Sequence, residues 1–173
     1  TGNTAEVDGG AIFALDDTTI DDSSFRQNES ATAAGGAIFV SSAAVVRIEQ
    51  SSFSENEANE AGAVNANADD VTISAVSFSN NVARDGDGGA FEGEVGSLAI
   101  ENSRFAENQA SGSGGALVFG GDELDSASIT SSSFQFNEAL DGLGGAVHLW
   151  SETELEIGEC AFEGNSSTDV GDR

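Results

Sequence analysis

Two short motifs alternate along the whole chain and define its repeat. A Gly-Gly-Ala step begins at residues 9, 35, 88, 114 and 144, and Ala61-Gly62-Ala63 is its variant in the third copy. The second motif, Phe-x-x-Asn, occurs once in each of six copies, and successive phenylalanines are 28, 25, 27, 29 and 28 residues apart. A period in this range is typical of stacked repeats, in which one unit buries its apolar face only against its neighbours. The Phe-x-x-Asn pairs are Phe25 and Asn28, Phe53 and Asn56, Phe78 and Asn81, Phe105 and Asn108, Phe134 and Asn137, and Phe162 and Asn165.

Side chains alternate within each copy, which predicts strands with one buried face. Val46, Ile48 and Ser51 stand seven, five and two residues before Phe53, and the later copies follow the same pattern. A helical repeat is disfavoured, because no copy contains ten residues with a 3.6-residue period. Each copy is therefore predicted to form about three strands of five residues or fewer. A second strand follows each Gly-Gly-Ala, with an inward column of Ile12, Ile38, Val64, Phe91, Leu117 and Val147.

Short strands at three per copy predict an all-β fold, a parallel β-helix (solenoid) of about six coils with 27 residues per coil, which forms a single domain over residues 1–173. Adjacent coils would lie ~4.8 Å apart. We expect the phenylalanines to stack from coil to coil, which adds ~0.5–1.5 kcal/mol per pair beyond burial. The asparagines are expected to form an amide ladder, since each side chain offers a donor and an acceptor. The paired glycines are expected to turn the chain with positive φ.

Three residues that suggest chemistry fall in structural columns of the repeat. Cys160 stands two residues before a phenylalanine, where the other copies have serine or valine, and we interpret it as a core filler rather than a reactive thiol. Asn28 and Asn165 both open an N-glycosylation sequon, but both also belong to the Phe-x-x-Asn motif. A structural role is the interpretation for both asparagines.

The charge of the chain excludes several partners. There are 31 acidic residues against five arginines and no lysine, and the net charge is −26. Such a surface repels nucleic acids and anionic membranes. No stretch approaches the ~20 apolar residues that span a bilayer, and no signal peptide is present, so we expect no direct membrane insertion. The acidity is typical of solvation in high salt, as in halophilic proteins, and the alternative interpretation is divalent-cation binding.

Calcium is the one cofactor that the acidic residues leave open, and none is expected to be required. Asp85 and Asp87 alternate with glycines and are followed by Glu92, but the spacing is not that of an EF-hand. The longest loop of the repeat is expected around Gly120-Gly121-Asp122-Glu123, because the fifth copy carries extra residues there. Asp122 is therefore the fourth candidate ligand, with a solvated loop as the alternative.

Aromatic residues on the outward side of the strands are the candidate ligand or interface residues. Alternation places His148, the only histidine, outward beside Trp150, in the column that holds Phe13 and Phe39 at the opposite end of the rod. One interpretation is an exposed strip that stacks on sugar rings or forms a lateral interface. The other is that flanking turns or neighbouring chains cover these rings.

The repeat is out of phase with both ends of the sequence. Residues 1–5 match the turn that follows a phenylalanine, and the last residues stop just before another Gly-Gly-Ala is due. Neither end shows the polar or helical cap that usually protects a stacked array. Two expectations fit: the chain is a segment of a longer β-helix, or units associate end to end into a filament.

Gly-Gly-Ala-Ile at residues 9–12 and 35–38, together with six Phe-x-x-Asn tetrapeptides, resembles the repeat of the polymorphic outer membrane protein family of chlamydial autotransporters. The resemblance implies a right-handed parallel β-helix displayed at the cell surface, with adhesion or surface structure as its role. It covers nearly the whole chain.

The sequence favours a non-enzymatic, extracellular β-helix module, as an adhesin stalk or a subunit of a surface fibre. β-Helices of the pectin lyase type cleave acidic polysaccharides with a basic residue, whereas this chain has no lysine and its arginines are scattered over different columns. The alternative function is a carbohydrate-binding or polysaccharide-active protein that uses the outward aromatic residues. The expected partners are a further copy or continuation of the same chain, or a surface glycan or receptor.

Overall fold

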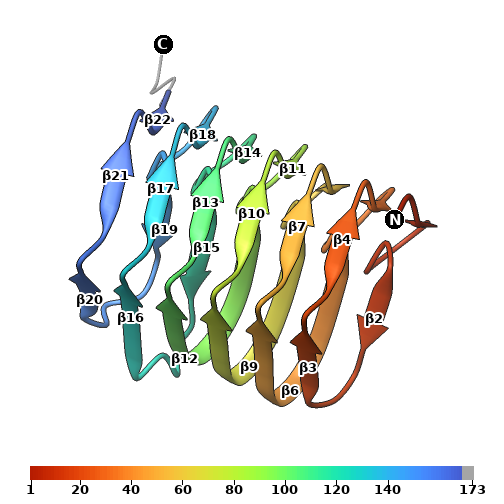
Figure 1. The fold of residues 1–173 in the computed structure, drawn as a ribbon, viewed down its shortest axis with the longest axis horizontal. Coiled ribbons are helices and arrows are strands. Elements are labelled where there is room, and N and C mark those ends of the chain that lie inside the picture. Colours follow the sequence, from red (N-terminus) through yellow and green to blue (C-terminus); the bar gives the residue numbers. More distant parts are fainter. Residues whose placement is uncertain (169–173) are drawn as a thin grey trace.

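The chain winds into a rod of stacked coils in which each coil contributes one layer to three parallel sheets (Figure 1). The computed structural model describes residues 1–168. Parallel pairing of equivalent residues holds throughout, so that Phe53, Phe78 and Phe105 lie side by side on neighbouring strands. The predicted all-β solenoid of about six coils is confirmed. Within the described residues, no helix could cross a membrane.

Two of the sheets consist of short strands that carry the Phe-x-x-Asn motif. The six-stranded sheet holds the phenylalanines, in the order β4 (Ser24–Arg26), β7 (Ser52–Ser54), β10 (Ser77–Ser79), β13 (Arg104–Ala106), β17 (Ser133–Gln135) and β21 (Ala161–Glu163). The seven-stranded sheet follows the asparagines, in the order β1 (Thr4–Ala5), β5 (Glu29–Ser30), β8 (Glu57–Ala58), β11 (Val82–Ala83), β14 (Gln109–Ala110), β18 (Glu138–Ala139) and β22 (Ser166–Ser167).

The third sheet contains strands longer than predicted. In the second to fourth coils, the strand after Gly-Gly-Ala continues into the strand before phenylalanine and gives single strands of 12, 11 and 11 residues. The expected limit of five residues was wrong there, because the neighbouring coils pair on both sides of the bend; in β6 the pairing crosses it with a register shift between Val40 and Ala43. The nine strands are β2 (Ile12–Ala14), β3 (Thr18–Asp21), β6 (Ile38–Glu49), β9 (Val64–Ser74), β12 (Phe91–Glu101), β15 (Leu117–Gly120), β16 (Ser126–Thr130), β19 (Val147–Leu149) and β20 (Leu155–Gly158).

The core is built from columns of like side chains. Successive phenylalanine rings of the six-stranded sheet stack with centroids 4.8 to 4.9 Å apart and with interplanar angles of at most 11°. The four central rings are fully buried, whereas Phe162 is 46% exposed because no described coil covers it. Cys160 packs against the core beside the serine column, as the sequence predicted for a filler.

The asparagines form the predicted ladder. Asn81 shows the pattern: its Nδ2 donates to the Phe53 carbonyl at 3.1 Å and to Asn108 Oδ1 at 2.9 Å, and its Oδ1 accepts from the side chain and backbone of Asn56. We call this column the asparagine ladder; its members are Asn28, Asn56, Asn81, Asn108, Asn137 and Asn165. Asn28 is 1% exposed and bonded in this way, which confirms its structural role.

The two glycines of each Gly-Gly-Ala serve different purposes. Gly35 has φ +67°, and the variant residue Ala61 adopts the same conformation at φ +51°. Gly36 does not have positive φ, but a Cβ there would lie 2.2 Å from the Gly62 carbonyl oxygen of the next coil. The expectation that both glycines turn with positive φ was therefore wrong for the second one, which is required by the close approach of two backbones.

Candidate functional site: a groove on the outer face of the nine-stranded sheet

One outward column of the nine-stranded sheet differs from every column of the core, because its members are chemically unlike. Register pairs Phe13 with Phe39, Phe39 with Asn65, and Asn65 with Glu92 across four coils. Val118 and His148 continue the same row. We call these six residues the outer column. Outward side chains on a parallel sheet stand roughly perpendicular to it, so the outer column can form one wall of a groove on the outer face of the sheet.

A groove runs beside the outer column, between the strands and the turns that precede them. Its cavity volume is about 470 Å³, within the range of small-molecule sites. Two aromatic rings, two amides and four carboxyl groups line it. Its lining includes Phe39, Glu60, Asn65, Glu92, Glu94 and Trp150.

Trp150 reaches the groove by packing over a glycine. It follows β19, and its backbone N–H donates to the Phe119 carbonyl at 3.2 Å. A Cβ on Gly120 would lie 2.5 Å from the indole Cδ2 and 2.6 Å from Cε2, so the ring lies against the bare backbone of the coil before its own. One face of the ring stays open, since Trp150 is 50% exposed.

Two buried oxygens in the groove have no hydrogen-bond partner within residues 1–168. They are Asn65 Oδ1 and Glu92 Oε2, which belong to paired positions on β9 and β12. Asn65 is only 7% exposed, so water reaches little of this side chain. A buried acceptor without a partner costs about 1–3 kcal/mol. Such groups are rare in folded proteins, and a bound water, ion or ligand is one way in which they are satisfied.

The electrostatics of the groove centre on Glu92. Burial raises the pKa of this carboxyl to about 7, and the negative charges of Glu60 and Asp87 act in the same direction. Hydrogen bonding to the Ala61 backbone lowers the pKa and offsets a smaller part of the effect. Glu92 is therefore close to half protonated at neutral pH, beside carboxylates that raise the cost of its own charge.

The structure brings together only two of the four outward aromatic candidates. Phe39 and Trp150 both line the groove. Phe13 stacks on Phe39 with centroids 5.4 Å apart, and its ring is 52% exposed at the edge of the sheet. His148 lies in the predicted column, with Nδ1 buried and unpaired within the described chain, but it does not line the groove.

The four acidic candidates for a metal do not form one site. Asp87 is near enough to Glu92 to raise its pKa, and Asp87 Oδ1 accepts a hydrogen bond from the Ser113 backbone at 2.6 Å. Asp85 and Asp122 do not complete a ligand set with them: over residues 1–168, no three His, Cys, Asp or Glu side chains are arranged to hold a metal ion.

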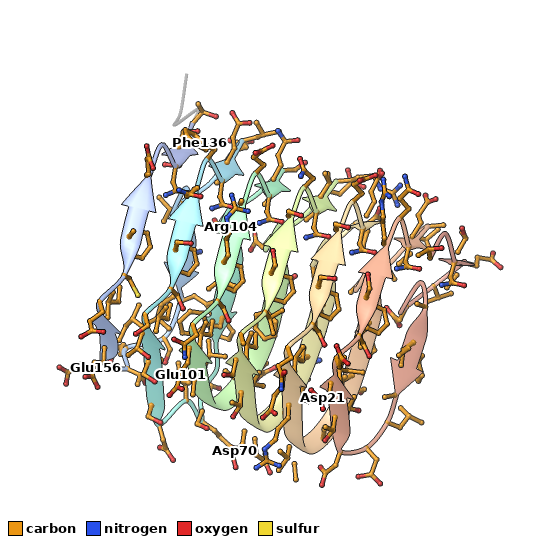
Figure 2. All side chains as sticks on the ribbon, viewed as in Figure 1. Asp21, Asp70, Glu101, Arg104, Phe136 and Glu156 are labelled. Carbon is orange, nitrogen blue, oxygen red and sulfur yellow. The ribbon has the colours of Figure 1, made fainter. Side chains whose placement is uncertain are left out.

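The loop predicted in the fifth copy lies between β15 and β16, and it extends the groove. Gly121 and Glu123 line a second hollow that shares Asn67 and Glu94 with the groove. Leu124 anchors the loop by turning into the core, where it is 6% exposed. Figure 2 shows the labelled side chains of Asp21, Asp70, Glu101 and Glu156 along one edge of the coils, outside the groove.

Asn65 and Glu60 were not among the residues predicted from the sequence, whereas Glu94 belongs to the acidic pattern after Asp85 and Asp87 that suggested calcium. One signal was present, because alignment on Gly-Gly-Ala places Asn65 and Glu92 in the same outward column as Phe39. Burial of that column could not be anticipated, since it depends on how far the preceding turn covers the strand. Glu60 lies in that turn, where it forms a parallel bridge with Ala34.

The fold and the groove define a class of protein, a parallel β-helix with a lateral groove on its longest sheet. A family model, described as right-handed beta helix region, matches residues 2–171, and the chain belongs to this family. The match is to the β-helix in general and does not resolve the resemblance to polymorphic outer membrane proteins. Comparisons with curated proteins and with solved structures gave no significant match.

Proposed function

We propose that the protein is an extracellular, non-enzymatic adhesive module that binds glycans in the groove. The observation that carries the proposal is the pairing of two aromatic rings, one of them half exposed, with two buried oxygens that have no partner within residues 1–168. Phe39 and Trp150 line the groove, and Asn65 Oδ1 and Glu92 Oε2, on coils between theirs, have no hydrogen-bond partner in the described part of the chain. Sugar rings offer C–H faces that pack on aromatic rings, and hydroxyl groups that donate to such oxygens.

The rest of the molecule supports a stiff surface module. Phenylalanine stacking and the asparagine ladder join every coil to the next, and Arg84 adds a bond across three coils. Its guanidinium lies 2.9 Å from Glu29 and 3.0 Å from Glu57, and these partners, the Glu29 hydrogen bond first, raise its pKa. The resemblance to polymorphic outer membrane protein repeats supports display at the cell surface, with further coils of the same chain or another copy as the natural neighbour.

One observation favours polysaccharide cleavage as the second candidate function. Glycoside hydrolases use one protonated and one ionised carboxyl group, and Glu92 with its raised pKa lies near Glu60 and Asp87. The proposal of a binding module and this alternative differ in whether a bound glycan is turned over.

A glycan array on the wild type, Trp150→Ala and Phe39→Ala tests the proposal. We expect the wild type to bind a defined subset of glycans and both variants to lose that binding. Phe136→Ala is the matched control, since Phe136 is, like Trp150, an exposed aromatic residue (55% exposed) but lies outside the groove (Figure 2). Absence of binding by the wild type, or equal binding by all variants, would overturn the proposal. Release of reducing ends from a bound glycan would establish the enzymatic alternative.

A further inference from the structure

The polar atoms that the groove leaves unsatisfied are acceptors of hydrogen bonds. Asn65 Oδ1 accepts only, and Glu92 Oε2 accepts whenever the carboxyl is ionised. Neither lysine nor arginine lines the groove in the described part of the chain. A ligand that satisfies these two oxygens must therefore bring the donors itself.

The negative charge of the groove favours a cationic ligand over a neutral or anionic one. Carboxylates of Asp8, Glu60, Glu92 and Glu94 line it, and the adjoining hollow adds Asp69 and Glu123. On a chain of net charge −26, an anionic ligand is repelled, and a neutral ligand leaves the mutual repulsion of these carboxylates in place. A cationic ligand relieves the repulsion and gains charge-assisted hydrogen bonds, which are about twice as strong as neutral ones.

The two aromatic residues of the groove, Phe39 and Trp150, suit a ligand that carries positive charge and also has sugar rings. The open face of Trp150 attracts a cation, and Trp is the best side chain for this interaction. The same face packs on the C–H groups of a sugar ring. From the coil of Phe39 to the coil of Gly120, over which the indole lies, there are three coil spacings, or about 14 Å. The groove is thus long enough for more than one sugar ring.

We infer that the groove binds an oligosaccharide of amino sugars whose amines are free and carry positive charge. The inference rests on the proposed glycan binding and names its ligand class. Ammonium groups would lie at Glu60 and Glu94, hydroxyl donors at Asn65 Oδ1, and ring faces on Phe39 and Trp150. A basic peptide could supply the charge, but it has no ring faces of this kind for the two aromatic residues.

Titration calorimetry at slightly acidic pH, where the amines are protonated, tests the inference with four probes. They are a glucosamine oligomer, its N-acetylated form, a neutral glucose oligomer of the same length, and oligolysine. We expect the glucosamine oligomer to bind at least tenfold more tightly than the other three. Equal binding of the acetylated or neutral oligomer would overturn the cationic ligand but leave glycan binding intact. Oligolysine that binds as tightly as the glucosamine oligomer would overturn the inference in favour of general charge attraction. Absence of binding by every glycan would overturn the proposed function as well.

Two variants that keep the net charge, and two that each remove one negative charge, separate binding in the groove from general electrostatic attraction. Asn65→Ala and Trp150→Ala should each weaken binding of the glucosamine oligomer by at least tenfold. Glu94→Gln should weaken it more than Glu107→Gln, which removes one charge from an exposed position outside the groove. Equal losses for these two glutamate variants, with no loss for Asn65→Ala and Trp150→Ala, would overturn the site.

Discussion

The asparagine ladder and the outer column both bury an asparagine, and they treat it in opposite ways. Asn81 in the ladder is fully buried, and its oxygen and nitrogen both have partners in neighbouring coils. Asn65 in the outer column is 7% exposed, and its oxygen has no partner within residues 1–168. In the ladder every neighbour is another asparagine, so each donor meets an acceptor. The outer column changes residue type at almost every coil, and no such match arises.

The difference separates structural from functional burial in one rod. A repeating column satisfies itself, because each coil supplies what the next one needs. A column that departs from the repeat is left with unmatched groups, and these are maintained only where the surrounding stack is stable enough to carry their cost. In this molecule the outer column is such a departure, and three of its six members line the groove.

The largest expected effect separates the phenylalanine stack from the outer aromatic residues. Phe105→Ala should lower the free energy of unfolding by about 3–5 kcal/mol, because it opens a cavity in the buried stack. Phe39→Ala removes a partly exposed ring and should cost less than about 1.5 kcal/mol. Urea denaturation of both variants measures the difference, and equal losses would mean that Phe39 is part of the core.

The repeating columns could largely be predicted from the sequence, whereas the surroundings of the outer column could not. Stacked phenylalanines, the asparagine ladder and the placement of Cys160 follow from the repeat, because residues at equal positions must meet in a solenoid. Glu60 and Asn65 escaped prediction, since their proximity depends on the depth of a turn that has no fixed residue pattern. The long strands escaped it as well, because pairing by both neighbours overrides the local break at Ser41 and Ser42.

The second effect compares the two asparagines directly. Asn81→Ala should cost about 2–4 kcal/mol, because the backbone N–H and one Nδ2 hydrogen of Asn56 lose their acceptor and the Phe53 carbonyl loses a donor. Asn65→Ala removes a group that is already unsatisfied and should change the free energy of unfolding by less than about 1 kcal/mol. Denaturant curves for the two variants, each compared with the wild type, test the contrast. Similar losses would show that Asn65 has a partner in solution.

The third effect depends on pH. The folded-state pKa of Glu92 is raised from 4.5 to about 7, so the folded protein binds more protons than the unfolded chain between these values. Stability from this group is present at pH 4 and is lost as the pH rises through about 7, by up to about 3 kcal/mol. Glu92→Gln should therefore equal the wild type at pH 4 and exceed its stability at pH 8. Glu107→Gln, at an exposed position, is the control, and its difference in stability from the wild type should not change with pH in this way. A constant difference across this range would contradict the assignment.

The smallest effect is that of salt, and it should act on the surface and leave the ladder unchanged. Screening shortens the Debye length from about 10 Å at 0.1 M to about 3 Å at 1 M, which weakens the repulsion among the carboxylates. The melting temperature of the wild type should rise with sodium chloride, while the deficit of Asn81→Ala relative to it stays constant. Calorimetric scans over a salt series measure both. A wild-type melting temperature that is flat in salt would contradict the electrostatic part of the account.

The most direct test of the groove is the melting temperature of Asn65→Ala with and without the glucosamine oligomer. A ligand that binds only the folded state raises the melting temperature of the protein that binds it. We expect the variant to melt with the wild type in the absence of the oligomer, and the oligomer to raise the melting temperature of the wild type by more than that of the variant. A variant that melts well below the wild type on its own, yet gains as much from the oligomer, would show that Asn65 serves the fold and not the ligand.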